Sequence, residues 1–287
     1  MRGKVIATVG GVYKVQTDSA HCHSVKPLGV LKHRKIQIVV GDDAEIDLSD
    51  STLTDIYPRK NLLIRPRIAN IDLGIVVISA DKPQFSSYLL DKFLTLLNFS
   101  GIRPLVVLSK SDLTDEETIG RIVGQYRKME IEVLPYSRSD EAAFAEILRR
   151  IEGKTAAFMG QSGVGKSSLI NRIDSGFSRA VGEYSQSLGR GKHQTKEVVL
   201  LPYRNGFIGD TPGFSSLELP FYKEDLARFS PCADRFYLSC RYDDCLHRNE
   251  PDCKVRESVF QGETDEENYR NYLTLSDELP SRKDRYQ

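Results

Sequence analysis

The chain has 287 residues and carries 40 Lys and Arg against 40 Asp and Glu, so its formal net charge is zero. This balance neither favours nor excludes a nucleic acid partner, and any basic surface must be local. The length accommodates roughly two or three domains with a sizeable core, so disulfides are not needed for stability. The chain shows neither an apolar run of about 18 residues nor a signal-peptide pattern, which predicts a cytoplasmic protein that does not enter a membrane.

Residues 1–65 are predicted to form a small β-barrel of the OB type. Short alternating runs are separated by turn signals such as Gly10-Gly11 and Gly41-Asp42. The runs that favour strands are residues 4–9, 12–15, 35–40 and 44–48. A basic stretch, residues 26–35, contains Lys26, Lys32, His33, Arg34 and Lys35, and we expect it to dock RNA. Residues 58–67, where two prolines bracket basic side chains, are expected to be a linker.

An α/β domain is predicted over residues 66–219. Continuous apolar runs, typical of buried parallel strands, alternate with stretches of helical spacing. The expected strands are residues 71–78, 103–108, 130–134, 155–159, 197–202 and 206–210, and the expected helices are 86–98, 115–128, 140–151 and one starting near Ser168. This alternation predicts a doubly wound parallel sheet.

A phosphate-binding loop follows the expected strand 155–159. The sequence Gly160-Gln-Ser-Gly-Val-Gly-Lys-Ser167 matches G-x-x-x-x-G-K-[ST] between a strand and a helix. Its backbone N–H groups and the helix N-terminus can cradle phosphates, whereas a flexible Gly/Ser loop is the alternative. The nucleotide-binding residues predicted here are Gly160, Gln161, Ser162, Gly163, Val164, Gly165, Lys166, Ser167 and Ser168.

Two further segments predict switch regions. Asp210-Thr-Pro-Gly213 ends a strand as D-x-x-G, which would place Asp210 at Mg²⁺ and the Gly213 N–H at the γ-phosphate. The glycine-rich, basic segment 188–195 is expected to be the first switch, with Thr195 as a ligand of Mg²⁺. Each segment alone could instead be an ordinary turn or a basic surface loop.

A guanine-reading motif is expected at Ser109-Lys-Ser-Asp112, after the strand 103–108. Asp112 can accept two hydrogen bonds from guanine that adenine cannot supply, so an ATPase is the less favoured alternative. A helix-capping turn would explain the tetrapeptide equally simply. GTPases usually place Asn where Ser109 stands, and we expect the shorter side chain to lose a contact to the phosphate loop. Because this motif precedes the phosphate loop, the order predicts a circularly permuted GTPase.

A Cys/His cluster lies in the last predicted region, residues 220–287. The pattern Cys240-x4-Cys245-x-His247-x5-Cys253 supplies three thiolates and an imidazole, which is a closed structural zinc set. Scattered free cysteines are the alternative, and Cys232 stays open as a rival ligand. The basic residues around the cluster could meet rRNA phosphate or form a solvated face: Arg235, Arg241, Arg248, Lys254 and Arg256. Residues 266–287 are expected to be a helix followed by a loose tail.

The combination resembles the ribosome small-subunit-dependent GTPase A family, RsgA, whose members are also called YjeQ or YloQ. The resemblance covers nearly the whole chain. It rests on Arg59-Lys-Asn61, Arg65-Pro66, Ile68-Ala-Asn-Ile-Asp72, the phosphate loop, Gly191-Lys-His-Gln-Thr195, Asp210-Thr-Pro-Gly-Phe214 and the Cys/His spacing. Because a hydrophobic residue, Phe214, follows the D-x-x-G motif, the resemblance implies that His193 positions the attacking water.

The expected protein is therefore a multidomain α/β GTPase with an OB-like barrel, a circularly permuted P-loop domain and a C-terminal zinc-binding α module. The resemblance implies that it binds the small (30S) ribosomal subunit and its 16S-type rRNA late in assembly, and that the subunit stimulates turnover. The expected catalytic residues are His193, Lys166 and Thr195, and the expected cofactors are GTP/GDP, Mg²⁺ held by Ser167 and Thr195, and one structural Zn²⁺. A monomer is expected. The alternative function is a nucleotide-gated rRNA-binding factor with negligible turnover.

Overall fold

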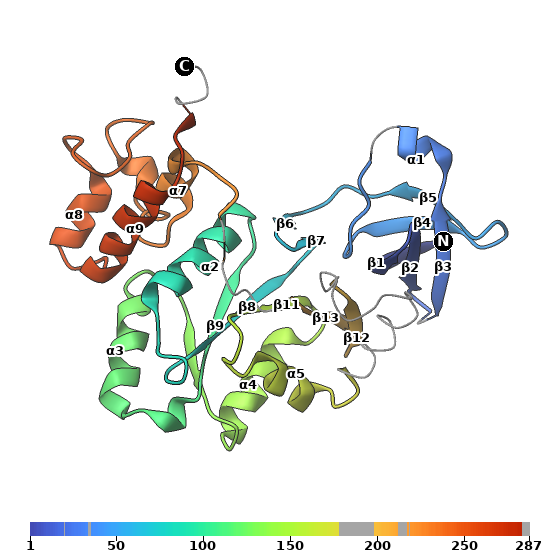
Figure 1. Cartoon of the computed structure of the whole chain (residues 1–287), viewed down its shortest axis with the longest axis horizontal. Coiled ribbons are helices and arrows are strands. Elements are labelled where there is room, and N and C mark those ends of the chain that lie inside the picture. Colours follow the sequence, from blue (N-terminus) through green and yellow to red (C-terminus); the bar gives the residue numbers. More distant parts are fainter. Residues whose placement is uncertain (20, 34–35, 178–197, 212–216, 218, 283–287) are drawn as a thin grey trace. The chain divides into compact units, whose positions relative to one another are not determined.

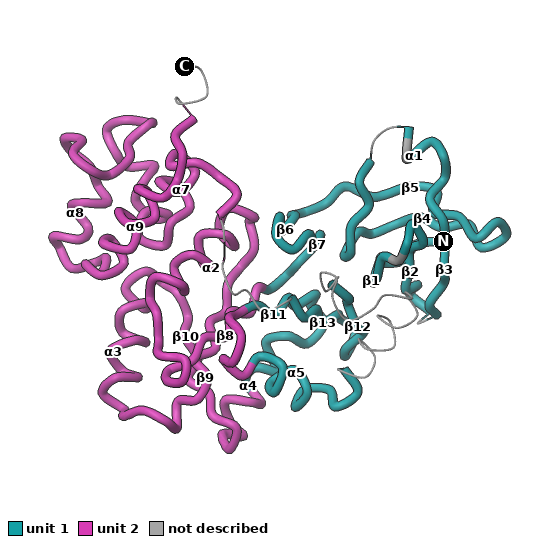
Figure 2. The backbone as a smooth tube through the Cα atoms, in the orientation of Figure 1, with its two compact units in different colours: residues 1–73, 146–159, 166–213 teal, residues 74–145, 160–165, 214–287 magenta. Residues whose placement is uncertain are grey.

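The computed structural model describes residues 1–19, 21–33, 36–177, 198–211, 217 and 219–282. The chain divides into two compact units, coloured separately in Figure 2. Unit 1 contains residues 1–73, 146–159 and 166–213, and unit 2 contains residues 74–145, 160–165 and 214–287. Each unit draws on separated stretches of the chain, so neither corresponds to one continuous sequence segment.

The N-terminal part of unit 1 is a closed β-barrel, which confirms the prediction (Figure 1). Its strands are β1 (Arg2–Val9), β2 (Val12–Thr17), β3 (Cys22–Pro27), β4 (Asp43–Asp47) and β5 (Thr52–Ile56), in the order β1-β2-β3-β5-β4, with the short helix α1 (Gly29–His33) after β3. Alternate side chains point inward, as strand geometry requires. The barrel core is made of Val5, Val15, Val25, Leu31, Ile38, Ala44, Ile46 and Leu53.

Two predictions for this region are wrong. Of the expected strand 35–40, the structure describes residues 36–40, and among these only Val40 pairs, in an isolated bridge to Ile68, although the side chain of Ile38 is buried in the core. The neighbouring Val39 N–H donates to the carboxylate of Asp42 instead of a ladder carbonyl. The expected linker 58–67 contains β6 (Leu62–Ile64), which forms an antiparallel hairpin with β7 (Arg67–Ala69). For residues 35–40, the alternation of apolar residues therefore predicted a buried side chain correctly but did not predict the backbone hydrogen bonding.

The rest of unit 1 contains the strand that precedes the phosphate loop in the chain and the helix that follows it. Strand β11 (Thr155–Met159) is fully buried and pairs in parallel with β13 (Gly206–Asp210). Strand β12 (Leu200–Tyr203) pairs antiparallel with β13 through the turn at Arg204 and Asn205, both with positive φ. Strand β12 thus runs antiparallel beside the parallel strands of the predicted doubly wound sheet, because a two-residue hairpin reverses the chain there. Helix α5 (Lys166–Ile173) follows the loop.

Unit 2 contains three parallel strands in the order β10-β9-β8, as expected for α/β topology. They are β8 (Leu73–Ser79), β9 (Pro104–Ser109) and β10 (Val133–Tyr136). Every residue of β8 is buried, which explains its uninterrupted apolar sequence. The helices α2 (Ser87–Phe99), α3 (Glu116–Arg127) and α4 (Glu141–Ile151) confirm the predicted helices to within a few residues.

The C-terminal part of unit 2 is helical. It comprises α7 (Lys223–Phe229), the short 3₁₀ turn η2 (Tyr237–Ser239), α8 (Lys254–Phe260) and α9 (Glu266–Glu278). Helices α7 and α9 both pack against α2, and Phe99 of α2 stacks on Phe221 with ring centroids 4.8 Å apart. The predicted C-terminal helix is confirmed, while residues 283–287 lie outside the described part. Among the described helices, none has the length and apolar character needed to cross a membrane.

Replacing Leu53 with Ala should destabilise the barrel by about 2–5 kcal/mol, because the side chain is fully buried in the core and its loss leaves a cavity. Urea unfolding, monitored through the amide exchange of the barrel strands, measures the change in the free energy of unfolding. Leu48→Ala, at a side chain that is 43% exposed, is the matched control and should cost less than about 0.5 kcal/mol. Equal costs for the two variants would contradict the assignment of this core.

Candidate nucleotide site and metal centre

The loop 160–165 has the backbone of a phosphate-binding nest. Gly160, Gly163 and Gly165 all have positive φ, at 155°, 82° and 93°. A Cβ added at Gly160 would lie 2.3 Å from the Val77 carbonyl oxygen, so no other residue fits there without moving β8. Val164 is buried and anchors the loop, while Ser162 and Gly163 are exposed. Such a loop at a helix N-terminus directs backbone N–H groups at an anion.

Lys166, the first residue of α5, has only 7% of its side chain exposed. Its ammonium donates to the Asp210 carboxylate and, at 2.7 Å, to the Thr211 carbonyl oxygen. Thr211 is fully buried, and its hydroxyl donates 2.9 Å to the Phe158 carbonyl of β11. The start of the D-x-x-G segment is thus fixed to the strand that leads into the phosphate loop. Ser167 and Ser168 follow on the exposed face of the helix.

The end of β9 is bonded to the same loop. The buried Ser109 hydroxyl donates 2.5 Å to the Val164 carbonyl, with the Ile78 carbonyl 3.1 Å away. The Lys110 ammonium donates 2.8 Å to the Gly163 carbonyl and also to the Lys82 carbonyl. The expectation that Ser109 loses its contact to the loop is wrong, because its hydroxyl reaches a loop carbonyl directly.

Asp112 lies one turn beyond, in the 3₁₀ turn Ser111–Leu113, and is exposed to solvent. Lys110 adopts the left-handed backbone conformation that precedes this turn, with φ of 56°. The guanine-reading role of Ser109, Lys110 and Asp112 stays a prediction, and the sequence did not reveal that Lys110 takes the left-handed conformation. His193, Thr195 and Gly213, together with Phe214, lie outside the described residues.

The four predicted metal ligands are brought together in the C-terminal part. One donor atom from each of Cys240, Cys245, His247 and Cys253 lies within 4.8 Å of the others. The His247 Nδ1 lies 3.5 Å from the Cys253 sulfur and 3.6 Å from the Cys240 sulfur. Three of the four residues are buried and Cys240 is partly so. A compact Cys3His set of this kind fits a tetrahedral Zn²⁺.

Neighbouring groups orient the cluster. The His247 Nε2 lies 2.8 Å from the Ala227 carbonyl of α7, so Nε2–H donates there and leaves Nδ1 as the ligand atom. Tyr269 of α9 donates 2.6 Å to the His247 carbonyl. Burial raises the pKa of the Cys245 and Cys253 thiols, so these sulfurs are poor anions unless a cation compensates their charge.

The remaining cysteines do not join the set. Cys232 is buried and its sulfur lies 3.3 Å from the Ser230 hydroxyl, while burial raises its pKa to about 12. Cys22 is exposed on the barrel. Cys232 is therefore not a member of the cluster. Of the nearby basic residues, Arg235, Arg241, Arg248 and Lys254 form ion pairs with Glu130, Asp252, Asp277 and Glu257 respectively.

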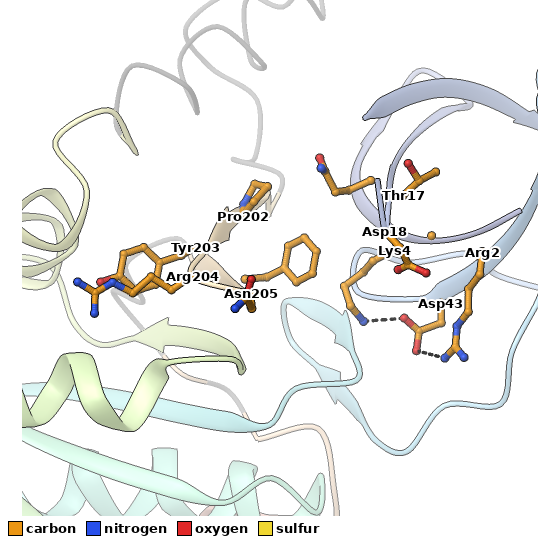
Figure 3. Close-up of a pocket in the computed structure, with 13 residues that line it drawn as sticks. Arg2, Lys4, Thr17, Asp18, Asp43, Pro202, Tyr203, Arg204 and Asn205 are labelled. Atoms are coloured by element: carbon orange, nitrogen blue, oxygen red, sulfur yellow. Dashed lines mark hydrogen bonds and ion pairs between the residues drawn. The ribbon is translucent and has the colours of Figure 1, made fainter. Parts of the chain in front are cut away.

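A separate polar cavity of about 620 Å³ lies within unit 1, between barrel strands and the β12–β13 hairpin (Figure 3). The Asp43 carboxylate accepts a 2.8 Å hydrogen bond from the Lys4 ammonium and pairs with Arg2 at 3.4 Å. The opposite wall includes Tyr203, Arg204 and Asn205. No residue of the phosphate loop lines this cavity, so it is not the nucleotide site.

A glycine nest before a helix, a buried lysine and a base-reading motif earlier in the chain together define a P-loop GTPase in circular permutation. A solved structure of YloQ, titled as a circularly permuted GTPase, matches this chain with TM-score 0.80 and 34% identity over 99% of this chain and 95% of its own. The structure of YjeQ from Thermotoga maritima matches with TM-score 0.80 and 30% identity over 97% of this chain and 98% of its own.

The RsgA GTPase model matches residues 56–220 and the RsgA N-terminal domain model matches residues 2–56. The curated protein from Mycoplasmopsis pulmonis named small ribosomal subunit biogenesis GTPase RsgA is 38% identical, with 97% of this chain and all of that protein covered. Its Bacillus subtilis namesake is also 38% identical, covering 99% of both chains. The chain belongs to the RsgA GTPase family and is a GTP-hydrolysing enzyme that uses guanine nucleotide and Mg²⁺.

Replacing Ser109 with Ala should weaken GDP binding by about tenfold, because it leaves the buried Val164 carbonyl without its short hydrogen bond. Isothermal titration with GDP and Mg²⁺ measures the affinity. Ser111→Ala removes a nearby hydroxyl that makes no described contact to the loop, and it should bind like the parent protein. Indistinguishable affinities for Ser109→Ala and the parent would show that this bond does not support the site.

Purified protein should contain one zinc per chain, and Cys253→Ser should remove most of it, because three ligands hold the ion less well than four. Elemental analysis after gel filtration measures the content. Cys232→Ser replaces another buried cysteine outside the cluster and should keep full zinc. Retention of zinc by Cys253→Ser, or its loss from Cys232→Ser, would contradict the assigned ligand set.

Proposed function

We propose that this chain hydrolyses GTP while bound to the small ribosomal subunit during late assembly, and that the subunit stimulates the reaction. The observation that carries the proposal is the bonding of Ser109 and Lys110 to the phosphate loop. These bonds support a site in which the proposed base-reading motif adjoins the phosphate loop despite the permuted order. The relatives' name, small ribosomal subunit biogenesis GTPase, supports the choice of partner.

In this proposal the loop from Gly160 to Gly165 and the N-terminus of α5 bind the β- and γ-phosphates through backbone N–H groups. Lys166 exchanges its contacts with Asp210 and Thr211 for phosphate oxygens. Asp112 accepts two hydrogen bonds from guanine, and Gly213 contacts the γ-phosphate. Bound Mg²⁺, held by Ser167 and Thr195, neutralises charge that develops on the phosphates.

Water activation is assigned to His193, since a hydrophobic residue, Phe214, follows the D-x-x-G motif. A neutral imidazole can accept the proton of an attacking water or fix its orientation. The Cys/His cluster is assigned no part in the chemistry, because four protein ligands close a tetrahedral site. One Zn²⁺ held by Cys240, Cys245, His247 and Cys253 would instead order the surrounding loops.

The domain bounds proposed are residues 1–65 for the RNA-binding barrel, 66–219 for the GTPase domain and 220–287 for the zinc module. The barrel offers an exposed Lys26 on β3 for contact with 16S-type rRNA. The ion pairs of the basic residues around the cluster weaken the case for rRNA contact there. The protein is proposed to act as a cytoplasmic monomer.

Two alternatives are less well supported. A nucleotide-gated binder without useful turnover would need the same phosphate loop, but membership of a GTPase family favours hydrolysis. An ATPase is disfavoured by the exposed Asp112 next to Lys110, because a carboxylate in this position repels the acceptor edge of adenine.

Purified small subunits should raise the rate of phosphate release from GTP at least tenfold and leave ATP hydrolysis unchanged, because a bound partner can position the catalytic groups. A phosphate-sensor assay with and without subunits measures the rate. Lys166→Ala should abolish hydrolysis under both conditions, since it removes the cation at the phosphates.

Large ribosomal subunits serve as the control partner and should stimulate little. Stimulation of ATP hydrolysis, or an equal effect of both subunits, would contradict the proposed activity. Absence of any stimulation would leave a GTPase whose activating partner differs.

A further inference from the structure

A buried carboxylate, Asp91, joins α2 to α9 and α3. The residue is 2% exposed and lies in the middle of α2. Its oxygens accept hydrogen bonds from the Asn268 amide at 2.9 and 3.0 Å, the Asn271 amide at 2.8 Å and the Tyr126 hydroxyl at 3.0 Å. Asn268 and Asn271 belong to α9 and Tyr126 belongs to α3, so side chains of three helices meet at one carboxyl group.

The donors to Asp91 are all neutral, so the described contacts supply no counter-charge. The titratable groups that face it are Tyr126 from α3, Glu267 from α9 and Cys232 from the segment after α7. None of these is a cation. Burying a carboxylate among neutral donors is costly, and the cost falls when the group is protonated.

Other contacts fix the orientation of the same helices. Asn268 is held from its other side, because its Oδ1 accepts a 3.0 Å bond from Gln125 of α3. Ser87 at the start of α2 donates 2.5 Å to Glu267 of α9. Helix α9 also reaches the metal centre, since Tyr269 and Tyr272 donate to the carbonyls of His247 and Leu246. Helix α9 therefore supports the loop that carries Leu246 and His247.

We infer that Asp91 is a proton-sensitive latch, which holds α9 on α2 and α3 more firmly when its carboxyl group is protonated than when it is ionised. The inference concerns the seating of α9 and does not depend on the ribosomal partner. It assigns a role to a buried ionisable group that takes no part in nucleotide or metal binding.

The direction follows from proton linkage. In the seated state the pKa of Asp91 is raised to about 7, and burial is the main cause. The hydrogen bonds from Asn271, Asn268 and Tyr126 lower this pKa, and the charge of Glu267 raises it. With α9 lifted, the exposed carboxyl returns to its ordinary pKa of about 4. The seated state therefore binds the proton more tightly. The stability that protonation adds to the seated state is fully present below about pH 4 and is lost as the pH rises through about 7.

Amide hydrogen exchange of α9 in the full-length protein tests the inference. Protection factors, corrected for the intrinsic exchange rate, are compared at pH 6 and pH 8 with zinc and GDP held constant. A pKa of about 7 predicts about tenfold greater protection of α9 at pH 6. Amides of the buried strand β8 serve as the internal reference.

Asp91→Asn should abolish this pH dependence, because the variant has no proton to gain. Glu278→Gln removes another carboxylate from α9 that bonds to α2 through Tyr88 but is half exposed, and it should keep the tenfold change. Protection of α9 that does not differ between pH 6 and pH 8 in the parent protein would overturn the inference. So would an unchanged pH dependence in Asp91→Asn.

Tyr126→Phe keeps the test valid if Asp91→Asn does not fold. The change removes one hydrogen bond to the ionised carboxylate, which should raise the pKa of Asp91 further. The midpoint of α9 protection against pH should therefore move to higher pH. A midpoint that stays in place or moves to lower pH would contradict the latch.

Discussion

Two hydrogen bonds from the end of β9 to carbonyl oxygens of the phosphate loop hold the nucleotide site together. Ser109 reaches the Val164 carbonyl and Lys110 reaches the Gly163 carbonyl. Because these bonds join residues that lie some 50 positions apart, the base-reading motif can precede the phosphate loop in the chain and still adjoin it in space. The permuted order is physically acceptable for this reason, since a folded site depends on contacts and not on sequence order.

Within unit 2, a further bond of Lys110 links this segment to the chain that leads into α2. Lys110 also donates to the Lys82 carbonyl, in the segment that leads through the Ser86 cap into α2. Helix α2 then carries Ser87 and Asp91, which bond to α9, and α9 supports the metal-binding loop. Described hydrogen bonds and short stretches of chain thus connect Lys110 with the Cys/His cluster.

The sequence predicted the strands of the α/β region and the four members of the metal cluster, because burial on both faces and ligand spacing leave strong local patterns. It did not single out β3, in which Val25 is the only buried residue of the strand, so the apolar alternation is absent. It also mistook residues 35–40 for a strand, since Ile38 is buried without ladder pairing. The contact of Ser109 could not be predicted, because the distance to a loop carbonyl depends on how β9 and the loop pack. The contacts of Asp91 could not be predicted either, because its partners are spread over α3 and α9.

The most direct test of the central claim is the nucleotide preference of Asp112→Asn. If residues 109–112 read the base for the loop 160–167, the wild-type carboxylate accepts two hydrogen bonds from guanine. The amide of the variant would instead donate one bond to the 2-carbonyl of xanthine. Competition binding should therefore show a preference for GDP over XDP in the parent protein and the reverse in the variant, by at least tenfold in each direction. A variant that still prefers GDP would show that this motif does not read the base, and the assignment of residues 109–112 would be wrong.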